Sequence, residues 1–253
     1  MTTIVLVIAT DTPIYKLFKD IWLQYYNISP YFKVHFVYGD SLKTKSHPND
    51  IHFPHIKEYV GEPATKLQRE HSMLEKTLEA FRFIDQLYNY NFVIRTNLTT
   101  FWDLPKHHIL TRNFPTTKFA IGTMRNIVSK EGTSENYISG TDLIITRDLV
   151  KNFIIDKPDI MTKPYSEDFS LSHFIKHDRG IELQEFIPKT QAVLENYTNY
   201  DPDTFEQLLK QYKNLYITHY RIKNKDRINV DLPIANHLLK MIYNKSISLP
   251  TNI

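Results

Sequence analysis

Apolar runs of strand length alternate with helical apolar stripes along the first part of the chain. The opening run is continuous and rich in β-branched residues, which is typical of a buried strand in a parallel sheet rather than of an amphipathic edge strand. The stripes repeat at helical spacing, and the first one follows capping residues and a proline. These patterns predict strands at residues 3–9, 34–38 and 92–96 and helices at residues 13–25 and 65–88.

The rest of the chain has a more broken pattern. It predicts strands at residues 118–123, 142–146, 181–187 and 216–220 and helices at residues 147–155, 167–177, 202–214 and 232–243. No internal repeat and no Gly/Ser linker separates this part from the first. We therefore expect one α/β domain over residues 1–253, with a Rossmann-like nucleotide-binding half at residues 1–100 and a mixed-sheet half at residues 101–253.

Composition excludes several classes of protein. Hydrophobic residues make up 42% and charged residues 23% of the chain, as in folded globular proteins and unlike disordered ones. The apolar runs are far shorter than the roughly 20 residues that span a bilayer, and no basic segment of a signal peptide precedes the first strand. We expect no membrane span and a cytoplasmic location, in the host cytoplasm if the source is a virus. The absence of cysteine excludes disulfides and cysteine-based metal or nucleophile chemistry.

The charges favour a small anionic ligand over nucleic acid. The 31 basic and 28 acidic residues are spread along the chain and form no clustered basic face. The turn after the first predicted strand contains no glycine, so it holds neither a GxGxxG dinucleotide motif nor a P-loop. An anion would therefore be bound by lysine and arginine side chains or through a metal.

Four stretches occur in the order found in one family of enzymes. They read LEKTL at residues 74–78, FVIRTN at residues 92–97, SGTDLIITRDL at residues 139–149 and SEDF at residues 166–169. They resemble the L-K-T, K-T-D-D-D, S-G-x-G-Y-x-x-S-R-D-L and E-D-V stretches of GT-A glycosyltransferases in the β-1,3-galactosyltransferase and fringe group. The match runs in order over residues 4–220 and implies a GT-A-like fold with a nucleotide-sugar-binding half and an acceptor half.

The resemblance implies an inverting glycosyltransferase that moves a sugar from a UDP-sugar to a glycan acceptor. The donor sugar stays open among xylose, galactose, glucose and N-acetylglucosamine. An acceptor hydroxyl is a poor nucleophile at neutral pH and needs a carboxylate that takes its proton. Asp168 matches the aspartate of E-D-V and is our candidate for that base.

Other positions are assigned to substrate binding. Thr10 and Asp11 follow the first strand, where ligands of open α/β sheets lie, so we expect them at the donor nucleotide. Trp102 is our candidate for acceptor binding. The matched stretches, and the basic and histidine positions that follow them, imply donor-binding roles for Lys76, Arg95, Asn97, Gly140, Glu167, His219 and Arg221.

The chain departs from the family at the metal site. Asn97, Leu98 and Thr99 stand where the relatives have three aspartates, and neutral oxygens are weak ligands for a hard dication. We therefore expect no required metal, with weak stimulation by Mn²⁺ or Mg²⁺. The charge on the departing UDP would then be neutralised by cations, for which Lys76, Arg95 and Arg221 are the nearest in sequence.

Each of these residues also has an ordinary structural interpretation. Glu167 and Asp168 suit the first turn of a helix, Lys76 suits a solvated helix face, and His219 and Trp102 suit a packed core. The missing aspartates motivate an alternative function, a non-catalytic glycan-binding or scaffold protein with a degenerate transferase fold. A nucleotidyltransferase is a weaker alternative, because it would need carboxylates to hold Mg²⁺.

Overall fold

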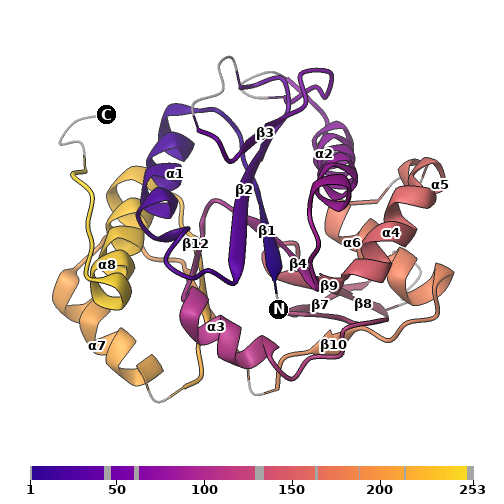
Figure 1. Cartoon of the computed structure of the whole chain (residues 1–253). Helices are drawn as coiled ribbons and strands as arrows, with labels where there is room; N and C mark the ends of the chain where they lie inside the picture. Colours follow the sequence, from indigo (N-terminus) through magenta and orange to yellow (C-terminus); the bar gives the residue numbers. More distant parts are fainter. Residues whose placement is uncertain are drawn as a thin grey trace. The chain divides into compact units, whose positions relative to one another are not determined.

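The structure is a computed structural model that describes residues 2–42, 47–59, 63–128, 134–162, 165–187, 189–213 and 215–249. It comprises two compact units, each assembled from segments far apart in the sequence (Figure 1). The first unit contains Met1–Asp11, Lys33–Asn97 and Asn113–Phe186. The second contains Thr12–Phe32, Leu98–Arg112 and Ile187–Ile253.

The first unit is built on a seven-stranded mixed sheet of order β10-β6-β9-β4-β1-β2-β3. The strands β1 and β4 are parallel neighbours, whereas β9 runs antiparallel to both β4 and β6. Every residue of β1 is buried, as its continuous apolar run predicts. The strands are β1 (Thr3–Ile8), β2 (Phe32–Tyr38), β3 (Asp50–His52), β4 (Phe92–Asn97), β6 (Ala120–Gly122), β9 (Leu143–Thr146) and β10 (Gln184–Glu185). A separate antiparallel pair joins β7 (Met124–Val128) and β8 (Ser134–Ile138).

Helices of the first unit pack their apolar side chains against the sheet and complete its hydrophobic core. The long helix α2 (Lys66–Leu87) begins at a capping box formed by Thr65 and Gln68, and it packs against β1, α4 and α6. Its buried side chains, with those of α4, meet the aliphatic residues of the sheet. The remaining helices are α4 (Arg147–Ile155), α5 (Lys157–Met161), α6 (Glu167–His173) and a π-helix at Phe174–Asp178.

The second unit has a three-stranded sheet of order β11-β12-β5. The strands β11 (Gln191–Glu195) and β12 (His219–Lys223) are parallel, and β5 (Thr100–Trp102) is antiparallel to β12. Helices from opposite ends of the chain pack together in this unit, α1 in indigo against α8 in yellow (Figure 1). Its helices are α1 (Pro13–Tyr25), α3 (Leu104–Thr111), α7 (Pro202–Lys213), α8 (Leu232–Tyr243) and a π-helix at Arg227–Asp231.

Most predicted elements are confirmed, and the differences have local causes. The strand predicted at 216–220 is β12, which begins at His219 because a turn closed by the Ile217 N–H and the Leu215 carbonyl precedes it. Only two residues of the strand predicted at 181–187 pair in the sheet. The helix predicted at 167–177 changes to a π-helix after His173, and residue 214 of the helix predicted at 202–214 lies outside the described residues.

Several short elements were not predicted. They are β3, β5, β7, β8, β11, α3 and α5. Of these, β3 and β5 have three residues each, too few to show a period. Among the residues that the structure describes, no helix has the length and hydropathy needed to cross a bilayer.

Candidate functional site

The carboxyl ends of β1 and β4 lie side by side in the sheet of the first unit. The two strands are parallel, with Ile8 paired to Asn97 in register. Thr10 and Asp11 follow β1, and both are half-buried, as is Asn97. The Asp11 N–H donates to Ser41 Oγ at 3.0 Å, which ties the turn after β1 to the turn after β2. Three of the predicted donor-binding residues therefore lie at the edge where open α/β sheets bind ligands.

Lys76 lies inside this unit and supports those turns. Its Nζ donates to the Ala9 carbonyl at 2.8 Å and forms an ion pair with Glu58. Glu58 accepts the Gly39 N–H at 2.8 Å, so one buried ion pair joins the turns after β1 and β2. Burial lowers the pKa of Lys76, and the Glu58 carboxylate opposes that shift. Because Lys76 is 1% exposed, we replace the expected contact with a donor phosphate by a supporting role.

Arg95 on β4 is the centre of a second buried network. Its Nε donates to Glu167 Oε1 at 2.8 Å, and its Nη2 donates to Oε2 of the same carboxylate. Its Nη1 donates to Asn97 Oδ1 at 2.7 Å and to the Gly140 carbonyl. Thr77 on α2 donates its hydroxyl to Glu167 Oε1 at 2.5 Å. The network fastens α2, β4 and α6 together, and it leaves Arg95 and Glu167 each 2% exposed, so neither presents a surface to a ligand.

Gly140 allows the loop before β9 to approach this network. A Cβ at this position would lie 2.9 Å from Arg95 Nη1 and 3.1 Å from its Cζ. It would also lie 3.4 Å from Asp168 Cβ. The glycine is therefore needed for close packing, and its role in the predicted donor site is to let Arg95 and Asp168 lie beside the loop.

Asp168 differs from its neighbour Glu167 in having no cationic partner. It is half-buried in the first turn of α6, and its Oδ1 accepts the Ser166 hydroxyl at 3.0 Å. The Phe169 N–H lies 3.0 Å from the same oxygen, and the Gly140 N–H lies 3.4 Å from Oδ2. Within the described residues Asp168 makes no ion pair. This carboxylate is held in place by neutral donors, and it has both an exposed surface and lone pairs that can accept a proton.

Glu70 is a further carboxylate beside Glu167 and Asp168, and it was not predicted from the sequence. It is half-buried on α2 and accepts the Glu167 N–H at 3.3 Å. Burial raises the pKa of Glu70, the Glu167 N–H lowers it, and the charges of Asp168 and Glu167 raise it further. Glu70 lies seven residues before Thr77, which places both on one face of α2. That spacing was the only sequence signal for it.

His219 and Trp102 pack against each other in the core of the second unit. Both are fully buried, and their rings stack with centroids 4.4 Å apart. His219 Nδ1 lies 3.1 Å from Thr218 Oγ1, which in turn lies 3.3 Å from His107 Nδ1. The structural interpretation therefore holds for both residues. The expected contacts of Trp102 with an acceptor sugar and of His219 with a diphosphate are replaced by core packing.

His107 and Arg221 are two further polar residues of this unit. Burial lowers the pKa of His107 well below its ordinary value, and the neighbouring His219 and His108 add to that shift. Its Nε2 is buried without a hydrogen-bond partner among the described residues. Arg221 on β12 pairs in register with Thr100 and is half-buried. Of the three cations expected to neutralise UDP, it alone keeps an exposed surface.

The segment of Asn97, Leu98 and Thr99 does not fit a divalent cation. The Asn97 side-chain oxygen already accepts from the Arg95 guanidinium, so positive charge adjoins the atom that would ligate a metal. Leu98 has no ligand atom and the Thr99 hydroxyl is neutral, whereas Mn²⁺ and Mg²⁺ prefer carboxylate oxygens. In the part of the chain that the structure describes, no group of three or more His, Asp or Glu side chains is arranged to hold a metal ion.

Comparison with known proteins bears on the fold. No protein-family model matches the sequence, and no curated protein matches it. Among solved structures, the galactosyltransferase LgtC in complex with donor and acceptor sugar analogues aligns over 99% of this chain and 98% of that chain. The TM-score is 0.55 and the sequence identity is 10%. The chain has a GT-A-like fold.

A second solved structure is a glycosyltransferase involved in glycosylation of the major capsid of PBCV-1. It aligns over 94% of this chain and 99% of that chain, with a TM-score of 0.47 and 10% identity. The likeness to LgtC, at a TM-score of 0.55, confirms the predicted α/β, GT-A-like fold class. Resemblance to the β-1,3-galactosyltransferase and fringe group stays a prediction, because a likeness at this identity reaches only as far as the fold.

Proposed function

We propose that the chain is an inverting glycosyltransferase that moves a sugar from a UDP-sugar to a glycan acceptor, with Asp168 as the general base. The observation that carries this proposal is the contrast between two adjacent carboxylates. Glu167 is buried and bound in a bidentate pair by Arg95, whereas Asp168 is half-buried and makes no ion pair in the described chain. The GT-A-like fold supports the same reaction class.

The proposed reaction is a single displacement. The acceptor hydroxyl oxygen bonds to the anomeric carbon as the bond from that carbon to the donor phosphate oxygen breaks, so the configuration inverts. The hydroxyl proton passes to an Asp168 carboxylate oxygen, and UDP leaves as the anion. Ser166 and the Gly140 backbone hold the carboxylate in place through the bonds described above. Proton transfer to a positioned base contributes about 10²-fold to 10⁴-fold to such reactions.

The proposed donor site is the edge formed by the carboxyl ends of β1 and β4. Thr10 and Asp11 would contact the base or ribose, and Asn97 would lie at the diphosphate side. The rigid ion pairs of Lys76 and Arg95 fix the backbone of this edge without contacting the nucleotide.

We propose that this transfer needs no metal held by the protein. Because the segment at Asn97 does not fit a dication, transfer in excess EDTA should stay within about threefold of transfer with added Mn²⁺ or Mg²⁺, a difference below 1 kcal/mol in the barrier. The measurement is initial rate against donor concentration in each buffer. Complete loss in EDTA with full rescue by Mn²⁺ would contradict the proposal and would direct attention to Asp103 and Asp142.

The alternative is a non-catalytic glycan-binding or scaffold protein. The observation that favours it is the burial of Lys76, Arg95 and His219, three residues that the resemblance places at the donor. A panel of UDP-sugars assayed for hydrolysis and for transfer to glycan acceptors separates the two functions. Turnover above an enzyme-free blank supports the transferase, whereas UDP-sugar binding without turnover on any acceptor supports the alternative.

A further inference from the structure

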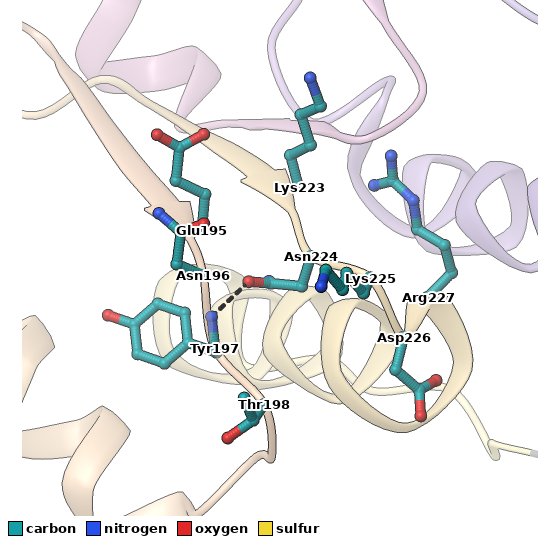
Figure 2. A pocket seen from close by; sticks show the side chains of 9 residues that line it. All are labelled: Glu195, Asn196, Tyr197, Thr198, Lys223, Asn224, Lys225, Asp226 and Arg227. Atoms are coloured by element: carbon teal, nitrogen blue, oxygen red, sulfur yellow. Dashed lines mark hydrogen bonds between the residues drawn. The ribbon is translucent and has the colours of Figure 1, made fainter.

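The second unit has an open pocket at the carboxyl ends of its two parallel strands (Figure 2). Its volume is about 660 Å³, large enough for a sugar residue. One wall follows β11 and the other follows β12. The lining residues are Glu195, Asn196, Tyr197, Thr198, Lys223, Asn224, Lys225, Asp226 and Arg227.

A buried amide fixes the two walls of this pocket to each other. Asn224 Oδ1 accepts the Tyr197 N–H at 2.7 Å, the bond drawn in Figure 2. Its Nδ2 donates to the Leu194 carbonyl at 3.3 Å and to Asp231 Oδ1 at 2.7 Å. Asn196 adopts a left-handed conformation with φ of 68°, which turns the chain at the end of β11. The pocket is therefore held open by bonds that do not depend on a ligand.

The pocket has cations that folding does not use. The side chains of Lys223 and Lys225 are exposed and make neither a hydrogen bond nor an ion pair within the described chain. Arg227 is paired with Asp231, and it also donates to the Ile222 carbonyl. The two lysines are therefore the ammonium groups that remain for an anion.

The acidic residues of the pocket neutralise the positive charge of the two lysines only in part. Asp226 accepts the N–H groups of Ile228 and Asn229 at 3.1 and 2.9 Å, and its bonds to Asn229 lower its pKa. Figure 2 shows its carboxylate directed away from Lys223. Glu195 extends on the same side as Lys223, from the neighbouring strand end (Figure 2). A carboxylate accepts hydrogen bonds from hydroxyl groups, and an ammonium group donates them to an anion. A ligand with both hydroxyl groups and an anionic group could therefore use both side chains.

The other lining groups suit a sugar ring. Tyr197 is half-buried and presents an aromatic ring, and burial raises its pKa. Asn196 and Thr198 flank it with an amide and a hydroxyl. An aromatic ring and a small number of polar groups are the usual components of a small-molecule site. We propose that this pocket binds a sugar that carries an anionic group, either phosphate or carboxylate.

This inference goes beyond the proposed transfer reaction, because binding here requires neither Asp168 nor turnover. The test is a set of calorimetric or NMR titrations of the intact chain with glucose 6-phosphate, glucuronic acid, glucose and inorganic phosphate. We expect one of the two anionic sugars to bind at least about tenfold more tightly than either glucose or inorganic phosphate. Preference between them identifies the phosphate or the carboxylate as the anionic group.

Variants locate the binding. Lys223→Gln with Lys225→Gln should weaken binding of the anionic sugar at least about tenfold, because both ammonium donors are lost. Tyr197→Ala should weaken it as well, whereas the matched control Lys240→Gln, exposed on α8, should not. Asp168→Asn should bind the sugar normally, so this inference can fail or hold separately from the proposed reaction. Absence of binding, equal binding of all four probes, or normal binding by the double lysine variant would overturn the proposal.

Discussion

Two buried ion pairs in the first unit and two exposed lysines in the second show two different uses of charged residues. In the first unit Arg95 and Glu167 are buried and satisfy each other, and Lys76 and Glu58 do the same. In the second unit the lysines at the end of β12 are exposed, and in the described chain they have no partner. A buried charge must be paired because losing water costs several kcal/mol, whereas an exposed cation adds little to folding. Burial, rather than membership of a motif, decides which charged residue can meet a ligand.

The largest effect should come from breaking the buried pair. Glu167→Gln leaves the Arg95 guanidinium in the core without a counter-charge, and we expect the free energy of unfolding to fall by about 3 kcal/mol or more. Urea denaturation measures it, with Glu182→Gln as an exposed control on the same unit. If Glu167→Gln costs no more than the control, the pair does not stabilise the fold and the comparison fails.

A smaller effect should appear in how the free energy of unfolding depends on pH, through His107 in the core of the second unit. The pKa of His107 lies well below its ordinary value because the imidazole is buried, so the folded state binds fewer protons than the unfolded state in acid. Stability from this residue is full above the unfolded pKa near 6.5 and falls as the pH drops, by about 1.4 kcal/mol per pH unit.

The slope of unfolding free energy against pH tests this. Between pH 6 and pH 5, the free energy of unfolding of His107→Gln should change less steeply with pH than that of the wild type. The difference should correspond to about one bound proton, whatever the absolute stability of the variant. The exposed His55→Gln is the control for removing a histidine that lies outside the core. An unchanged slope for His107→Gln would mean that its imidazole ionises as readily in the folded core as in water.

The smallest effect should come from the exposed cations. Lys223→Gln with Lys225→Gln removes two charges that folding does not use, so the free energy of unfolding should change by less than about 0.5 kcal/mol. The same denaturation series provides the value. A loss approaching that of Glu167→Gln would show that these lysines are structural, and it would remove the contrast between the units.

Long periodic elements could be predicted from the sequence, because burial leaves a repeating apolar signal. The strand β1 and the helix α2 are examples, since one is apolar throughout and the other along one face. The strand β5 could not be predicted, because three residues show no period. Its place in a sheet depends on pairing with β12, more than a hundred residues later.

The candidate site was predicted only in part, for a similar reason. The positions of Asn97 at a strand end and of Asp168 in the first turn of a helix could be predicted, because strand ends and helix starts leave local signals. The roles of both residues at a site stay predictions. The burial of Lys76 could not be predicted, since its partner Glu58 lies in a loop with no sequence relation to α2. Glu70 was missed because its contact with the α6 backbone depends on how the two helices pack. Contacts between segments far apart in the sequence therefore decide whether a side chain such as Lys76 or Glu70 is buried and what it binds.

The most direct test of the central claim is the turnover of Asp168→Asn. The amide keeps the shape of the side chain but cannot take a proton, so transfer should fall by about 10²-fold or more. Affinity for UDP and the free energy of unfolding should stay near the wild-type values, because Asp168 makes no ion pair in the described chain. Asp159→Asn, exposed on α5, is the matched control and should transfer normally. Near-normal turnover by Asp168→Asn would contradict the assignment of the general base.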